Sequence, residues 1–574
     1  MSRRGLASSG VLRSPSTRLY AKRADDLVET AAINVCWGMP SDTGGGEYAD
    51  QSRPHYNNPI TAWGPKLADI GFRYARQCLG FSWPYNLDNP DSSPVGWQST
   101  MTQASNAMNY LDGLGLKLGY TMWVPRDYTW LATGAFPKPA WLEGANEPPY
   151  PTYNQMYAAN PQFAWSLSGR GVAPNATQYN VGDMVGASLF NGFVAGSPPF
   201  VCIKQHTPTA GNTPPLGSNQ IYYKSEFWQT SLALTCGNTM QWADSLMSTV
   251  PGWSTGIDLV APSTVSTVDQ MTPVQKASVA SWYRNFHDYH LPNGSQEPAW
   301  YTYHDPASPN FITNDWNGSY QRGYITEFTA WRCGPADGIS AVSETDAAKM
   351  WVRSFAIGHY VFGFRKLVGW MATEHVGDNK EGQTCNPVQS TGYPTVGYQG
   401  RAGLIYKYAS GGGSAGAGYK VPAVWLKRLF GIYGERNVGR YVLTGLLPVW
   451  ASRDSRLVET LHERSDGKLL YGFVLNVEPT ADEGTNNFTV TEDTPTGNPD
   501  GMAILGTVGK YQNGKSMTKL TNATATTVSF DRTFSNVESY DFSTGNWTTI
   551  GARAAGQAVS VQATETFKIL RLTP

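Results

Sequence analysis

Two acidic residues occupy positions from which they could act as a pair. Glu147 follows a short run of apolar and small residues at 141–146, and Glu327 lies in a second such run at 323–331. Each run has the length of a β-strand, so each carboxylate would sit at the mouth of a parallel sheet and not on a helix face. Two carboxyls about 5 Å apart repel, which raises the pKa of one, while a neighbouring Arg keeps the other ionised. One protonated and one ionised carboxyl are what cleavage of a glycosidic bond requires.

The elements that must position these residues alternate between strand-like and helix-like runs. We predict strands at 31–37, 72–79, 116–125, 141–147, 257–262, 298–305, 323–331 and 366–371. We predict helices at 63–70, 101–113, 240–250, 272–290, 344–364 and 421–433. Strand followed by helix, repeated, is the pattern of an α/β fold with a parallel sheet and crossover helices.

Two regions break this alternation. From 158 to 230 the helical period vanishes and turn-forming residues dominate, which predicts a small inserted β-module. From about 437 the chain shows alternating runs such as 468–475, 527–530 and 566–572, separated by Asn, Gly and Asp. These runs predict a C-terminal antiparallel β-sandwich.

The Asn-Glu-Pro at 146–148 and the Thr-Glu-Phe at 326–328 resemble the acid/base and nucleophile strands of glycoside hydrolase clan A. In that clan these are strands four and seven of a (β/α)8 TIM barrel, and the chain looks nearest to family 39, with families 5 and 30 as neighbours. The resemblance implies Glu147 as acid/base and Glu327 as nucleophile of a retaining glycosidase. The domains expected are a leader at 1–30, the barrel at 31–157 and 231–436, the inserted module at 158–230 and the sandwich at 437–574.

The resemblance also implies a set of substrate-binding residues. Asn146 would bind the sugar 2-hydroxyl, and a strand-two Arg would hold the nucleophile ionised. Arg76 is the better candidate for that role, and Arg73 is the alternative. Trp370 would form the floor of the subsite for the reacting sugar.

The strand-six position of the clan is matched by Tyr303 and His304, although the usual His-x-Tyr order is not kept there. Trp37 and Trp123, in the first and third strand runs, complete the expected substrate-binding set. Two further acids, Glu143 and Glu374, are expected near the site as substrate contacts or as solvated loop residues.

The inserted region carries a second resemblance. Its Tyr-x-x-Gly-Asp-x-Val at 179–185, Phe-Val-Cys-Ile at 200–203 and Trp228 look like small chitin-binding-type modules of chitinases and phage tail proteins. This implies sugar-binding aromatic residues at Tyr179, Tyr222, Tyr223 and Trp228. The alternative is that these rings form the core of the module, because a domain this small needs large side chains to bury enough surface.

The composition limits the kinds of partner that this protein is expected to bind. Charged residues make up 15% of the chain and the net charge is -1, so we expect no nucleic-acid partner and no membrane surface partner. Aromatic residues reach 13%, which suits either bulky cores or stacking on sugar rings. No apolar stretch is long enough to span a membrane. The N-terminus lacks the apolar segment of a secretory signal, so we expect an extracellular or virion-associated protein exported by another route or after removal of its signal.

The six cysteines lack any C-x-x-C spacing, so we predict no metal site and no cofactor. Cys36 and Cys78 are expected to be buried thiols, and Cys202 with Cys236 is a possible disulfide.

The sequence leaves two functions open. The first is a retaining glycoside hydrolase, endo-acting on an exopolysaccharide or another cell-surface or plant glycan. The second is a non-catalytic carbohydrate-binding or phage-tail-associated protein on an inert barrel. The presence of both Glu147 and Glu327 favours the first, because an inert barrel has no physical reason to keep two adjacent carboxyls.

Overall fold

The structure is a computed structural model that describes most elements of the predicted fold. The described residues are 18–35, 60–79, 101–122, 136–144, 163–171, 173, 175–186, 200–216, 225–230, 252–253, 256–261, 282–283, 285–289, 323–329, 344–370, 372, 403–405, 419–435, 440–453, 457–475, 481–482, 488–490, 511–513, 516–517, 526–564 and 566–574.

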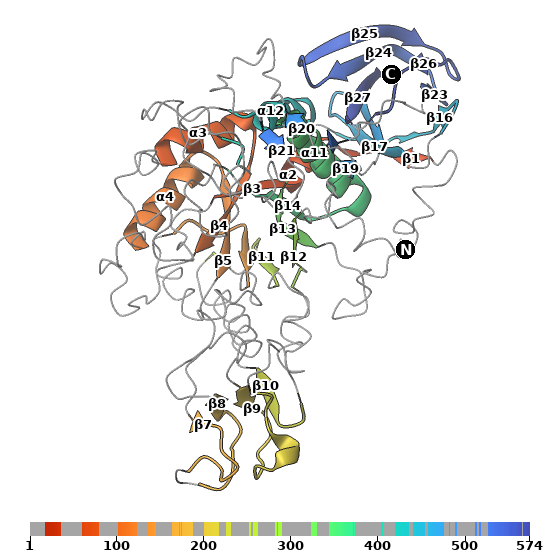
Figure 1. Cartoon of the computed structure of the whole chain (residues 1–574). Helices are drawn as coiled ribbons and strands as arrows, with labels where there is room; N and C mark the ends of the chain where they lie inside the picture. The colour runs from red at the N-terminus through yellow and green to blue at the C-terminus, as the bar shows by residue number, and fades with distance from the viewer. Residues whose placement is uncertain are drawn as a thin grey trace.

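A curled sheet of eight parallel strands lies at the centre of the α/β part (Figure 1). In chain order its strands are β3 (Ala31–Asn34), β4 (Tyr74–Leu79), β5 (Lys117–Met122), β6 (Trp141–Glu143), β11 (Asp258–Val260), β12 (Asn285–Tyr289), β13 (Tyr324–Thr329) and β14 (Lys366–Gly369). Their spatial order is β11-β6-β5-β4-β3-β14-β13-β12. Val260 at one edge forms a parallel bridge with Tyr283, which lies two residues before the start of β12 at the other edge. This bridge links the two edges of the curled sheet, and we call these strands the barrel sheet; a complete (β/α)8 barrel stays a prediction.

Four described helices belong to this part of the chain. They are α3 (Ile60–Ile70), α4 (Met101–Gly113), α11 (Glu344–Ile357) and α12 (Val421–Tyr433), and they follow β3, β4, β13 and β14. A π-helical turn, η3 (Gly358–Phe362), extends α11. Gly71 ends α3 with a φ of 106°, a conformation that a residue with a Cβ rarely adopts. All four helices agree with the sequence prediction to within a few residues.

One predicted helix is wrong at its end. Residues 285–289, assigned to a helix at 272–290, form strand β12, which pairs in parallel with β13. Trp282 and Phe286 have helical spacing in the sequence, but the backbone of 285–289 forms its hydrogen bonds with β13, which lies far away in the sequence. The sixth strand is therefore β12, while the strand predicted at 298–305 and the helix predicted at 240–250 lie outside the described residues.

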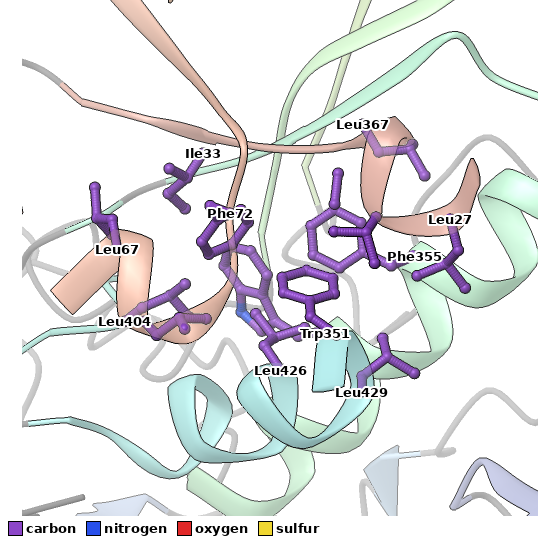
Figure 2. Packing of buried hydrophobic residues seen from close by; sticks show 14 of the residues in the cluster. Leu27, Ile33, Leu67, Phe72, Trp351, Phe355, Leu367, Leu404, Leu426 and Leu429 are labelled. Atoms are coloured by element: carbon purple, nitrogen blue, oxygen red, sulfur yellow. The ribbon is translucent and has the colours of Figure 1, made fainter. Parts of the chain in front are cut away.

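Aromatic side chains join the helices to the barrel sheet. Figure 2 shows Trp351 and Phe355 of α11 between Leu367 of β14 and the leucines of α12. The ring of Phe355 lies 5.7 Å from that of Phe430 in α12, in an edge-on arrangement. A Cβ on Gly369 would meet the Trp351 ring at 2.0 Å, so a glycine is needed where this indole packs on β14.

The end of the predicted leader is part of the fold. Residues 19–30 contain β1 (Leu19–Tyr20), β2 (Lys22–Arg23) and the helix α2 (Asp25–Thr30). Strand β1 pairs with β15 (Gly445–Leu446), and β2 pairs in parallel with β17 (Leu457–Glu463). This segment therefore ties the C-terminal strands to the start of the barrel sheet.

The C-terminal region is built from antiparallel pairs. A six-stranded sheet has the order β2-β17-β18-β27-β24-β25, and a three-stranded sheet has the order β16-β23-β26. The other strands of these two sheets are β16 (Pro448–Trp450), β18 (Leu469–Leu475), β23 (Thr527–Phe530), β24 (Phe534–Asp541), β25 (Asn546–Arg553), β26 (Val559–Ser560) and β27 (Lys568–Thr573). Two further pairs are β19 (Ala481–Asp482) with β22 (Ser516–Met517) and β20 (Phe488–Val490) with β21 (Tyr511–Asn513). Both larger sheets contribute to one apolar core, which includes Trp450, Phe473 and Val528. A complete sandwich stays a prediction.

A separate sheet of four short strands lies where the sequence predicts the inserted module. Its strands are β7 (Phe163–Ala164), β8 (Met184–Gly186), β9 (Phe200–Cys202) and β10 (Trp228–Thr230), and a 3-10 turn, η2 (Ala210–Asn212), precedes β10. Figure 1 shows this module across the barrel sheet from the C-terminal sheets. Cys202 is a free, buried thiol, so the possible disulfide with Cys236 is not formed.

Candidate active site

The interior of the barrel sheet is filled by two layers of side chains. The lower layer is an apolar cluster made of Ala32, Tyr74, Trp141, Val260, Tyr324 and Val368. Residues two apart on a strand face the same side of a sheet, so the next inward layer comes two residues later on each strand. We call this second layer the polar layer; it contains Asn34, Arg76, Glu143 and Thr326, to which the hydrogen bonds described below add Thr121, Asn285, His287 and Glu327. It lies toward the carboxyl ends of the strands, where enzymes of this architecture carry their chemistry.

A glycine makes the lower layer possible. A Cβ on Gly119 of β5 would lie 1.8 Å from Cε2 of Trp141, so the indole occupies the space that a side chain at 119 would fill. Two residues further on, Thr121 belongs to the polar layer and donates to Glu143. The large ring below thus supports the polar groups above it.

Arg76 is the centre of the polar layer. Its side chain is fully buried, and it donates from Nε to Oε2 of Glu143 at 2.6 Å and from Nη2 to Oε1 at 2.7 Å. Its Nη1 donates to Oδ1 of Asn34 at 2.8 Å and to Oε1 of Glu327 at 2.8 Å. This paired geometry is the strongest that a guanidinium offers to a carboxylate. The Arg76–Glu327 hydrogen bond is the contact that the resemblance implied.

The alternative arginine has a different role. Arg73 precedes β4 and donates to both oxygens of Asp25, at 2.6 and 2.7 Å, and to Oε1 of Glu29 at 2.6 Å. Its partners lie in α2, the helix that leads into β3, so Arg73 stabilises the junction of α2 with the barrel sheet. Of the two arginines, Arg76 is therefore the one that contacts Glu327.

Glu143 is not a substrate contact, contrary to the expectation from the sequence. Its side chain is fully buried and accepts hydrogen bonds from Arg76, from Thr121 at 2.9 Å and from Asn285 at 2.8 Å. Burial acts to raise the pKa of Glu143, but the charge of Arg76 and the hydrogen bonds of His287 and Arg76 hold the pKa at about 2. Glu143 is therefore an ionised carboxylate deep in the polar layer.

A β-bulge directs two consecutive residues of β13 into the same interior. The register between β12 and β13 shifts from Phe286↔Ile325 to His287↔Glu327, so Thr326 is an extra residue with no partner in this ladder. Thr326 approaches Oε1 of Glu143 at 3.1 Å, and Glu327 accepts from Arg76. In a regular strand, neighbours point to opposite faces, so the bulge is what lets both side chains reach the polar layer.

His287 is the site residue that the sequence analysis missed. It lies in β12, with Nδ1 3.3 Å from Oε2 of Glu327 and Nε2 3.0 Å from Oγ1 of Thr326. The His-x-Tyr order that is not kept at Tyr303 and His304 is present in this sequence at His287-Asp288-Tyr289. That tripeptide is the sequence signal for this strand, and the helix predicted at 272–290 includes it.

Trp370 comes directly after β14, two residues beyond Val368 of the lower layer, and its side chain is largely buried. Its backbone N–H donates to the carbonyl of Phe328 at 2.7 Å, one residue after Glu327. The structure thus brings Trp370 to the same strand end as Glu327. Its role as a subsite floor stays a prediction.

The remaining predicted residues of the site lie outside the described residues. They are Trp37, Trp123, Asn146, Glu147, Tyr303 and His304, together with Glu374. The distance between Glu147 and Glu327 stays a prediction for this reason.

In the inserted module, the expected sugar-binding role of two residues is wrong. Tyr179 and Trp228 are fully buried and form the module core with Val185, Phe200 and Cys202. The hydroxyl of Tyr179 accepts from the backbone N–H of Ser166 at 2.9 Å. A sheet of four short strands has little else to bury, so its largest rings face inward. Tyr222 and Tyr223 lie outside the described residues.

The solved structures that are similar to this chain include glycoside hydrolases, each at low sequence identity and with a low TM-score. No protein-family model and no curated protein matches the sequence. A family 39 glycoside hydrolase from Bacteroides cellulosilyticus WH2 is 9% identical with a TM-score of 0.37, over 96% of this chain and 83% of that one. A family 39 enzyme from Xanthomonas axonopodis pv. citri is 10% identical with a TM-score of 0.40, over 100% and 99%. A family 30 xylanase C from Talaromyces cellulolyticus is 11% identical with a TM-score of 0.36, over 98% and 99%.

The fold assignment therefore rests on the strand order and the closing bridge, and the chemistry rests on the polar layer. Within the described ranges, no group of three His, Cys, Asp or Glu side chains could hold a metal ion. No described helix is long and apolar enough to cross a membrane. What the polar layer offers is a buried carboxylate, Glu327, held by a guanidinium at the carboxyl end of a parallel strand, an arrangement suited to nucleophilic attack.

Proposed function

We propose that this chain is a retaining glycoside hydrolase that cleaves a polysaccharide by double displacement. The observation that carries the proposal is the hydrogen bond of 2.8 Å from Nη1 of Arg76 to Oε1 of Glu327 inside the barrel sheet. A hydrogen bond from a guanidinium favours the ionised form of a carboxyl, and an ionised carboxylate is what must attack the anomeric carbon.

In the proposed reaction, Glu327 attacks the anomeric carbon while the carboxyl of Glu147 protonates the departing glycosidic oxygen. A covalent glycosyl ester on Glu327 results. Glu147, now a carboxylate, then removes a proton from water, which cleaves the ester and restores both groups. Retention requires the two carboxyls to be about 5 Å apart, which is the separation we expect.

The proposed substrate is a neutral glycan chain bound across the carboxyl ends of the strands. Asn146 would hold the 2-hydroxyl of the reacting sugar and Trp370 would stack under it, with Trp37 and Trp123 extending the contact. We propose endo action on an exopolysaccharide or another cell-surface or plant glycan, by a protein that works outside its cell or on a virus particle.

The test is a screen of the purified protein against a panel of polysaccharides, with products separated by size, beside the variant Glu327→Gln. Hydrolysis by the wild type that the variant lacks would support the proposal, and long products early in the reaction would indicate endo action. Binding of a polysaccharide without hydrolysis by either protein would replace the proposal with a carbohydrate-binding function on an inert barrel.

A further inference from the structure

The polar layer contains a second ionised carboxylate that the proposed reaction does not use. Glu143 lies four residues before Glu147 in the sequence, and its two oxygens accept hydrogen bonds from Arg76, Thr121 and Asn285. An ionised carboxylate can only accept hydrogen bonds. Each polar group that forms a hydrogen bond with Glu143 must therefore turn a hydrogen-bond donor toward it.

This constraint passes along a chain of three hydrogen bonds. Asn285 donates from Nδ2 to Oε1 of Glu143 at 2.8 Å, so its Oδ1 points away and is an acceptor. Oγ1 of Thr326 lies 2.7 Å from that Oδ1 and 3.1 Å from Oε1 of Glu143, both of them acceptors, and its single hydroxyl hydrogen is donated to the nearer Oδ1. The oxygen of Thr326 then has only lone pairs to offer its next neighbour.

That neighbour is Nε2 of His287, 3.0 Å from Oγ1 of Thr326. Since the threonine oxygen is an acceptor in this contact, Nε2 must carry a hydrogen. The other ring nitrogen, Nδ1, lies 3.3 Å from Oε2 of Glu327, which offers only lone pairs when it is the ionised carboxylate of the proposed function. Both ring nitrogens of His287 therefore face acceptors.

The charges of the layer agree with this hydrogen-bond pattern. Among the described residues, the charged groups that face His287 are Glu327 on β13, Glu143 on β6 with its Oε1 4.0 Å from Nε2, and Arg76 on β4. With Glu327 ionised, as the proposed function requires, Glu143, Glu327 and Arg76 together carry one negative charge, which an imidazolium at His287 balances. An uncompensated charge inside a protein is costly, so the neutral sum is favoured.

We propose that Glu143 is a positioning residue that keeps His287 as an imidazolium, so that each oxygen of Glu327 faces a cation. Arg76 faces Oε1 and His287 faces Oε2. A carboxylate held between two cations stays ionised before it attacks, and it also leaves readily from the glycosyl ester. This benefit for turnover rests on the proposed function.

The experiment is ¹⁵N NMR of the histidine rings in the full chain, labelled at its 8 histidines. The signals of His287 are assigned by their loss in His287→Gln. We expect both ring nitrogens of His287 to be protonated at pH 7.5, about one pH unit above the usual histidine midpoint. A single protonated nitrogen at that pH would overturn the proposal.

The decisive variant is Glu143→Gln, which keeps the size of the side chain and removes its charge. We expect the midpoint of the His287 titration to fall by about one pH unit or more. Thr326→Val cuts the hydrogen-bond chain but keeps every charge, and we expect it to lower the midpoint as well. If Glu143→Gln does not fold, Thr326→Val decides the matter alone, and an unchanged midpoint in each folded variant would refute the proposal.

A matched control is Glu463→Gln. Glu463 is also buried and accepts hydrogen bonds from the backbone N–H groups of Val442 and Thr444, at 2.6 and 2.8 Å, in the C-terminal region. We expect Glu463→Gln to lower the melting temperature without changing the midpoint of the His287 titration. The control thus distinguishes a general loss of stability from a specific effect on the charge of His287. Because the NMR measurement needs no substrate, it tests the role of Glu143 even if no polysaccharide in the panel is hydrolysed.

Discussion

Arg76 and Glu327 are separated by 251 residues in the sequence and are joined inside the barrel sheet by a hydrogen bond of 2.8 Å. The same guanidinium binds both oxygens of Glu143, so one cation holds two buried carboxylates. Removing a partner from a buried ion pair leaves an uncompensated charge, which is why such pairs are far more sensitive than surface pairs.

The first prediction uses this contrast. Arg76→Met should lower the free energy of unfolding by about 3–5 kcal/mol or more, since two carboxylates lose their cation. The control is Arg18→Met, which breaks an exposed ion pair with Asp531 and should cost no more than about 1 kcal/mol. Urea unfolding of both variants measures the difference. Equal losses would show that Arg76 is not a main support of the layer.

A second prediction concerns the roles of the two proposed catalytic acids. Glu147→Ala should lose activity on natural glycans but spare aryl glycosides with activated leaving groups, because these need no proton from the enzyme. Azide should rescue the variant by attacking the glycosyl ester in place of activated water. The check is the rate of aryl release with and without azide, beside Glu327→Gln, which should be inactive on every substrate. Similar losses in both variants on both kinds of substrate would leave the role assignment unsupported.

A third prediction tests the lower layer. Gly119→Ala places a Cβ 1.8 Å from the Trp141 ring, so the indole or the strand must move. We expect a loss of stability above the roughly 1–3 kcal/mol usual for overpacking, together with loss of activity, because the polar layer rests on that ring. Gly113→Ala, at the end of α4 with no atom within 4 Å of the new Cβ, is the control. If both variants melt at the wild-type temperature, the close approach of Gly119 to Trp141 is not as described.

A fourth prediction concerns acid stability. His462 of β17 is fully buried against the rings of His359 and Tyr433, with centroids 5.4 and 4.9 Å away. Burial, helped by the charge of Lys22, lowers the pKa of His462 well below its usual value. Below about pH 6.5 the unfolded chain binds a proton at this residue and the folded chain does not, so stability falls as the pH drops.

From this one residue, the free energy of unfolding is expected to fall by up to about 1.4 kcal/mol for each pH unit below pH 6.5. His462→Phe should remove that part, so its urea midpoint should change less between pH 7 and pH 5 than that of the wild type. At pH 8 the histidine is neutral in both states, and the comparison there reports packing alone. Parallel pH dependences would show that another group accounts for the acid sensitivity.

A fifth prediction addresses the inserted module. Its described strands pair only with one another, so replacing residues 158–230 by a short Gly/Ser bridge should leave the barrel sheet intact. Binding energy gathered far from the cleaved bond mainly tightens association with long chains, so the deletion should raise KM on polymer and spare short oligosaccharides. Kinetics on both substrates provide the measurement. Equal losses would mean that the module supports the barrel, and no change would point to attachment elsewhere.

Much of the frame could be predicted from the sequence because helices and strands have different periods. The bounds predicted for α4 and α12 match the structure, and the sequence alone places Arg76 and Glu327 on the second and seventh predicted strands. Local spacing reports which residues share a face of an element, and that information is contained in each segment.

Tertiary structure decided which faces meet and where the period is broken. The bulge at Thr326 and the strand at His287 depend on the pairing of β12 with β13, which no single segment contains. The burial of Glu143, Tyr179 and Trp228 likewise depends on what packs against them. The sequence thus determined which residues are candidates for chemistry. Only the tertiary structure decided that Glu143 binds Arg76 inside the protein. A buried charge is stable only when oppositely charged and hydrogen-bonding groups surround it, and here those groups come from other strands.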